Sequence, residues 1–346
     1  MNAKHRSLGA ASAIFFLLRT GALASEAPLL GVTYTHFALA MSRVGACAAE
    51  SRAATMQGGA AIPQYNIPNV REVVRKQLKA IAKAGFDSLR TIIWFSRVPG
   101  DGMVSSRERD AQSVEEKVAL FSEDVTNAGF KHWTVVFGAQ GKNSPSCRKI
   151  DWGDCFDPSL TDENWGLIRR LRLVIGGVTG KRINVSYDLV SEGCPSRYLK
   201  SRYYDQLFAY DQVILSRYSA LFGQLDARIS CANGDIERVD RLIELYGSVK
   251  FNSDVLDVHL YDTSQSSMYK TMEAVLDAAT KNGMKIVIGE MVYHNDAQIA
   301  AIGAFIKRHP NSIYEILQWP IQKPDTQCHM DVSPPFEPGN LRKVVR

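Results

Sequence analysis

The chain has 346 residues, of which 45% are hydrophobic, enough for one large core or two ordinary domains. Its formal net charge is +5, but the N-terminal segment carries three of the positive charges, on Lys4, Arg6 and Arg19, and no acidic residue. The remainder is therefore close to neutral, which argues against nucleic acid as the main partner.

The N-terminal segment has the pattern of a secretory signal peptide. A basic cluster precedes an apolar run at 8–18, and a small-residue cleavage motif ends at Ala24. We predict that residues 1–24 are a leader and that 25–346 form an exported domain, periplasmic or extracellular. An uncleaved N-terminal anchor is the alternative. No later run is long enough to cross a bilayer, so stable membrane insertion after cleavage is not expected.

Strand-like and helix-like patterns alternate after the leader. Short apolar runs predict eight strands, at 29–36, 88–95, 133–138, 183–190, 227–231, 255–261, 285–289 and 313–319. Apolar residues at helical spacing predict helices between them, at 70–84, 114–128, 163–175, 203–222, 236–246, 268–282 and 297–308. Gly85, Gly129 and Gly283 follow three of these helices, where glycine commonly ends a helix.

This alternation predicts an α/β fold, a single-domain (β/α)8 TIM barrel, in which each strand is followed by a helix or by the final tail. The strands read as continuous apolar runs, which is typical of parallel strands covered by helices. An open, doubly wound sheet is the alternative. No glycine-rich nucleotide motif opens a helix, which disfavours a nucleotide-binding version of that alternative.

Six cysteines are present, and none belongs to a CxxC pair, which argues against a structural zinc site. An even number in an exported chain suggests disulfides, with free buried thiols as the alternative. In a closed barrel, loops after neighbouring strands lie side by side. The loops that carry the cysteines then suggest three bridges: Cys194–Cys231, Cys47–Cys328 and Cys147–Cys155.

Two glutamates lie where predicted strands end, Glu192 after 183–190 and Glu290 after 285–289. A buried charge without a partner is costly, so a carboxylate at such a position needs a reason. In a parallel barrel, the C-terminal strand ends carry the chemistry. Two carboxylates that face each other across a sugar-sized gap are the groups that glycoside hydrolysis requires.

The strand-end residues resemble those of clan A glycoside hydrolases, the superfamily of retaining TIM-barrel enzymes that includes families 5 and 39. There, strand four ends in Asn-Glu with the acid/base residue, and Ser191-Glu192 occupies that position here. Strand seven carries the nucleophile, often after glycine, and Gly289-Glu290 matches it. Other strand ends match as well, with Arg90 on strand two, His259 and Tyr261 on strand six, and Trp319 on strand eight.

The resemblance implies an exported retaining β-glycosidase that acts on a polysaccharide or oligosaccharide by double displacement. Glu290 would be the nucleophile, kept ionised by Arg90 and Tyr261. Glu192 would be the acid/base, its pKa raised by burial and by the negative charge of Glu290. Trp319 would stack under a sugar ring.

Other residues would surround the substrate. His259 and His36 would contact sugar hydroxyls. The family's Asn contacts the sugar 2-hydroxyl, and Ser191 is shorter, which leaves room for a different 2-substituent or for a chain that has lost catalysis.

Two further hypotheses remain open at this point. One is a carbohydrate-binding TIM barrel without hydrolytic activity. The other is a metal-dependent hydrolase on the same fold, for which His36, His259 and His294 are the candidate ligands. Their spacing is not that of a metal site, so we expect no metal and no cofactor.

Overall fold

The computed structural model of the protein describes residues 27–34, 61–100, 102–145, 156–195, 201–232, 236–262, 264–319 and 338–345, without the side chains of 201–203. Within these residues ten strands form one sheet. They are β1 (Leu29–Thr33), β2 (Ser88–Ser96), β3 (Val104–Ser105), β4 (His132–Ala139), β5 (Asn184–Asp188), β6 (Ala227–Arg228), β7 (Ser230–Cys231), β8 (Val255–Leu260), β9 (Lys285–Val292) and β10 (Ile313–Trp319).

The sheet is rolled into a parallel barrel. The strand order is β6-β5-β4-β2-β1-β10-β9-β8-β7, and β1 pairs with the last strand, β10. The two ends of this order, β6 and β7, follow each other in the chain and are separated only by Ile229. Together they occupy one strand position in the ring, because β6 pairs with β5 on one side and β7 pairs with β8 on the other. The predicted (β/α)8 barrel is therefore confirmed, and the open sheet is excluded.

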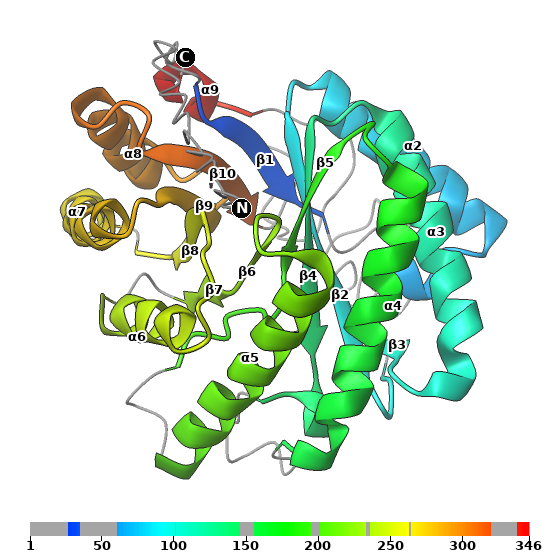
Figure 1. Ribbon diagram of the computed structural model, residues 1–346. Helices are drawn as coiled ribbons and strands as arrows, with labels where there is room; N and C mark the ends of the chain where they lie inside the picture. Colours follow the sequence, from blue (N-terminus) through cyan, green and yellow to red (C-terminus); the bar gives the residue numbers. More distant parts are fainter. Residues whose placement is uncertain are drawn as a thin grey trace, which may run out of the picture.

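Helices cover the outside of the barrel (Figure 1). They are α2 (Pro68–Lys83), α3 (Ala111–Ala128), α4 (Thr161–Thr179), α5 (Ser201–Phe222), α6 (Ile236–Ser248), α7 (Gln265–Lys281), α8 (Asp296–Arg308) and the short α9 (Leu341–Val345). Each longer helix buries an apolar stripe, as α2 does with Val70, Val74 and Leu78. None of the helices in the described part of the chain is long and apolar enough to span a bilayer.

Two strands differ from prediction in ways that matter for the site. Strand β5 ends at Asp188, because the chain then turns, with the Gly193 N–H donating to the Val190 carbonyl at 2.9 Å. Strand β9 continues to Val292, so Glu290 lies inside a strand rather than after one. The two-residue β3, which pairs with the end of β2, is too short to produce a periodic pattern in the sequence.

The lower part of the barrel interior holds charged side chains instead of only branched apolar ones. His132, at the start of β4, contacts Glu315 of β10 at 2.7 Å, and Arg228 of β6 lies 3.5 Å from the same carboxylate. Arg228 also donates to Asp257 of β8 at 2.5 Å. All four side chains are buried. We call these four residues the barrel-floor network.

Candidate active site

Glu290 lies in β9 at the C-terminal end of the barrel, and both of its carboxylate oxygens accept hydrogen bonds. Arg90 of β2 donates to Oε1, and the hydroxyl of Tyr261, just after β8, donates to Oε2. Arg90 is fully buried and Glu290 is 5% exposed. A guanidinium and a phenol hydroxyl therefore hold this carboxylate in place through a hydrogen bond to each oxygen.

Glu192 follows β5 in a turn whose backbone is left-handed at this residue, with a φ of 51°. Its N–H donates to the hydroxyl of Ser230 at 2.8 Å. Two residues further on, Cys194 forms a disulfide with Cys231, as the sequence predicts. The other two suggested bridges involve cysteines outside the described residues. The turn that carries Glu192 is thus attached to β7 by a covalent bond and by a hydrogen bond.

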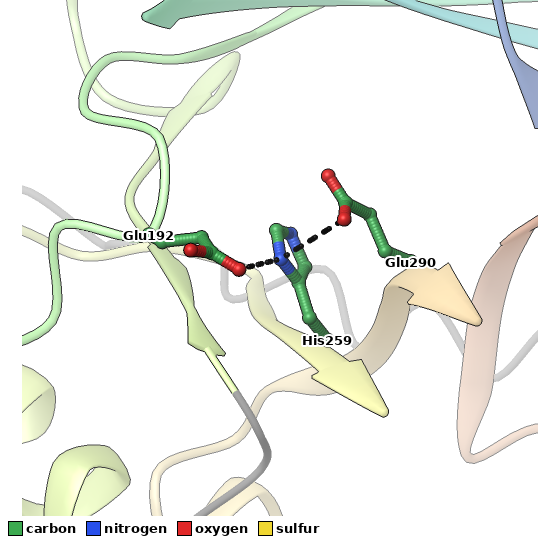
Figure 2. Close-up of side chains that lie close together, drawn as sticks. All are labelled: Glu192, His259 and Glu290. Carbon is green, nitrogen blue, oxygen red and sulfur yellow. Dashed lines mark hydrogen bonds and ion pairs between the residues drawn. The ribbon is translucent and has the colours of Figure 1, made fainter. Parts of the chain in front are cut away.

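His259 lies between the two glutamates (Figure 2). Its Nδ1 is 3.0 Å from Glu192 Oε1 and 3.6 Å from Glu290 Oε2, and its Nε2 is 3.5 Å from Arg90 Nη2. His259 and Glu290 are register partners across β8 and β9, which explains their proximity. Burial lowers the pKa of His259, but the charge of Glu290 and the hydrogen bond with Glu192 together raise it above its ordinary value.

One carboxylate oxygen from each glutamate and one ring nitrogen of His259 lie within 4.8 Å of one another. Such a group has the composition of a metal site. However, Arg90 and Tyr261 already occupy both oxygens of Glu290, and the Arg90 guanidinium would repel a cation beside it. We therefore interpret the group as two carboxylates bridged by a histidine.

The remaining residues expected at the site are placed as follows. Ser191 precedes Glu192 in the same turn, and its N–H donates to the Phe137 carbonyl at 3.2 Å. Trp319 ends β10 at the same end of the barrel and is partly exposed. His36 lies outside the described residues. His294 stacks on Tyr293 at 4.1 Å, beyond the end of β9.

Two residues near the glutamates were not expected from the sequence, Asp188 and Ser230. Asp188 is the last residue of β5 and lies 3.9 Å from Arg90. It accepts hydrogen bonds from the N–H and the hydroxyl of Ser230, at 3.1 and 2.6 Å. Burial and the charge of Asp257 raise the pKa of Asp188 to about 6, although Arg90 and Ser230 lower it. A charged residue inside an apolar strand run was the only available signal.

Comparison with known proteins identifies relatives in structure only, since no family model and no curated protein matches the sequence. A GH5_18 protein from Streptomyces cattleya, solved with Manβ1-4GlcNAc, has a TM-score of 0.57 and 14% identity over 92% of this chain and 79% of that one. An exo-β-1,4-mannosidase from an Opitutaceae bacterium has a TM-score of 0.58 and 12% identity over 92% of this chain, but only 58% of that one.

A β-mannanase from Thermomonospora fusca, in complex with mannotriose, has a TM-score of 0.52 and 13% identity over 88% of this chain and 82% of that one. The chain shares its (β/α)8 barrel fold with these three proteins. At such low identity the likeness is one of architecture, and it carries no residue roles with it.

Proposed function

We propose that the protein is an exported retaining β-glycosidase, with Glu290 as nucleophile and Glu192 as acid/base. The observation that carries the proposal is the pair of carboxylates at the C-terminal end of a TIM barrel, with one oxygen of each and the ring of His259 within 4.8 Å. Retaining enzymes hold their two carboxyl groups about 5–5.5 Å apart, whereas inverting enzymes leave about 6.5–9.5 Å for a water molecule. The nearest oxygens of the pair, no more than 4.8 Å apart, leave little room for an intervening water molecule, which favours retention.

The different surroundings of the two glutamates support different roles. The Glu290 side chain is 7% exposed and is held by Arg90 and Tyr261, as suits an oriented, ionised nucleophile. The Glu192 side chain is 25% exposed, so it can reach both a leaving group and water. Acid/base work requires this access in both halves of the reaction.

The reaction would proceed in two displacements. Glu192 gives its proton to the glycosidic oxygen while Glu290 attacks the anomeric carbon, which breaks the glycosidic bond and forms a glycosyl-enzyme ester. Glu192 then takes a proton from water, and that water displaces Glu290 from the same carbon. His259 is hydrogen-bonded to Glu192 and lies 3.6 Å from Glu290, so a protonated imidazole would stabilise negative charge on either carboxylate.

We propose a β-linked polysaccharide or oligosaccharide that contains mannose as substrate. Support comes from proteins of the same fold, which include a mannotriose complex and a Manβ1-4GlcNAc complex. Trp319 would stack on a sugar ring at the C-terminal end of the barrel. Ser191 has a short side chain and would leave space near the sugar 2-position. Export rests on the N-terminal signal pattern and is consistent with the Cys194–Cys231 disulfide.

The test is turnover of β-mannan, β-glucan and mixed oligosaccharides by the wild type, Glu290→Gln and Glu192→Gln. Glu244→Gln, an exposed residue of α6, is the matched control. We expect both active-site variants to lose at least about 10³-fold in kcat and the control to keep wild-type activity.

Proton NMR of the first product gives the anomeric outcome. An inverted product, or full activity in Glu290→Gln, would contradict the assignment. Sugar binding by calorimetry without any product would point instead to a carbohydrate-binding barrel.

A further inference from the structure

We propose that Ser230 and Asp188 are positioning residues that hold the Glu192 backbone in the geometry needed for proton transfer. The inference rests on the proposed function, since it concerns how the acid/base residue is oriented. Neither residue needs to touch substrate, and both act through the turn that carries Glu192. Both are fully buried.

A continuous chain of hydrogen bonds joins Asp188 to Glu192. The Ser230 hydroxyl donates to Asp188 Oδ2 at 2.6 Å, and the Ser230 N–H donates to Asp188 Oδ1 at 3.1 Å. The same hydroxyl oxygen accepts the Glu192 N–H at 2.8 Å. The hydroxyl can donate in only one direction, so the carboxylate of Asp188 fixes its proton and turns its oxygen toward Glu192.

The backbone at Glu192 needs this support. A φ of 51° is unfavourable for a residue with a side chain, because Cβ then lies too close to a backbone carbonyl oxygen. Such strain persists only where surrounding contacts determine the conformation. The Ser230 hydroxyl accepts a hydrogen bond from the N–H of Glu192 itself, whereas the Cys194–Cys231 disulfide holds the turn two residues after Glu192. Loss of the Ser230 hydroxyl would leave the disulfide intact and allow the backbone at Glu192 to relax.

Asp188 also reaches the second glutamate. It lies 3.9 Å from Arg90, which donates to Glu290. One buried carboxylate therefore supports the acid/base residue through Ser230 and the nucleophile through Arg90. This arrangement predicts different effects for the two positioning residues, because Ser230 serves Glu192 alone and Asp188 serves both glutamates.

Leaving-group dependence separates these effects. The dinitrophenolate of a 2,4-dinitrophenyl glycoside leaves without being protonated, so kcat/KM for this substrate depends on Glu290 but not on the acid function of Glu192. The alkoxide of an alkyl glycoside is a poor leaving group and needs the proton from Glu192. We expect Ser230→Ala to lower kcat/KM at least tenfold for the alkyl glycoside and less than about threefold for the dinitrophenyl one. Asp188→Asn should lower both. Ser122→Ala removes a buried hydroxyl from α3 and is the matched control.

A second readout does not depend on turnover. If Ser230→Ala frees Glu192, the hydrogen bond between His259 Nδ1 and the Glu192 carboxylate is lost, and NMR titration should show a lower His259 pKa than in the wild type or in Ser122→Ala. If the wild type hydrolyses no glycoside, the proposed function fails while this titration still decides the positioning role. Equal leaving-group ratios and an unchanged His259 titration in Ser230→Ala, with only a lower Tm, would overturn the inference.

Discussion

Replacement of Glu315 by glutamine tests whether the barrel-floor network stabilises the protein through charge. Glu315 is fully buried in β10. It accepts from His132 and Ser88, and Arg228 lies 3.5 Å away. Glutamine keeps the size of the side chain and removes the charge, so His132 and Arg228 lose a negative partner while packing is preserved.

The magnitude follows from the Glu315 pKa. Burial alone would raise this pKa, but the charges and hydrogen bonds of His132, Arg228 and Ser88 lower it from 4.5 to about 2. Because the folded-state pKa lies below the unfolded one, the ionised carboxylate stabilises the fold above pH 4.5, and this stabilisation disappears as the pH falls through about 2. The difference corresponds to about 3 kcal/mol at neutral pH, of which roughly half is lost by pH 3.

The assay is urea unfolding of the wild type and Glu315→Gln from pH 7 to pH 3, with Glu244→Gln as control. We expect Glu315→Gln to be less stable by about 3 kcal/mol at pH 7 and by roughly half of that at pH 3. Carboxylates remote from Glu315 titrate equally in both proteins, so the difference between the curves reports on the barrel-floor network alone. A constant difference across this pH range would refute the electrostatic explanation and leave only a packing effect.

Three further predictions follow from single contacts. Tyr261→Phe removes a donor to Glu290, so kcat on a confirmed glycoside should fall roughly 10²-fold with little change in KM. Cys194→Ser opens a bridge between residues 37 positions apart, so urea unfolding should show a loss of up to about 4 kcal/mol. Gly289→Ala places a Cβ 2.1 Å from the buried Asp257 carboxylate, so thermal unfolding should show a lower Tm, from overpacking of about 1–3 kcal/mol.

The sequence predicts the fold well because the barrel depends on local patterns. Apolar runs locate the strands, helical spacing locates the helices, and their strict alternation leads to a parallel sheet covered by helices. Local patterns do not predict the details of the barrel that depend on which strands pair in the folded protein. The interruption at Ile229 arises because β6 and β7 pair with different neighbours, a condition that no local pattern records.

The same distinction applies to the candidate site. Glu192 and Glu290 stand out because each is a charge next to an apolar strand run. Ser230 lies 38 residues from Glu192 in the chain, and its positioning role can be recognised only from the hydrogen bond between them in the folded protein. The left-handed backbone at Glu192 is also invisible in the sequence, since glycine or asparagine is the usual marker of such a conformation.

Charge alternates along the barrel interior, from the mouth toward the floor. Glu290 pairs with Arg90, which lies beside Asp188, while Asp257 pairs with Arg228, which approaches Glu315. Each of these buried charges therefore has an opposite charge beside it, which offsets part of its desolvation cost. An apolar floor would leave Asp188 and Asp257 with fewer cations nearby. The charged interior thus helps to hold Arg90 in place beside Glu290, the kind of preorganisation that the proposed glycosidase site would need.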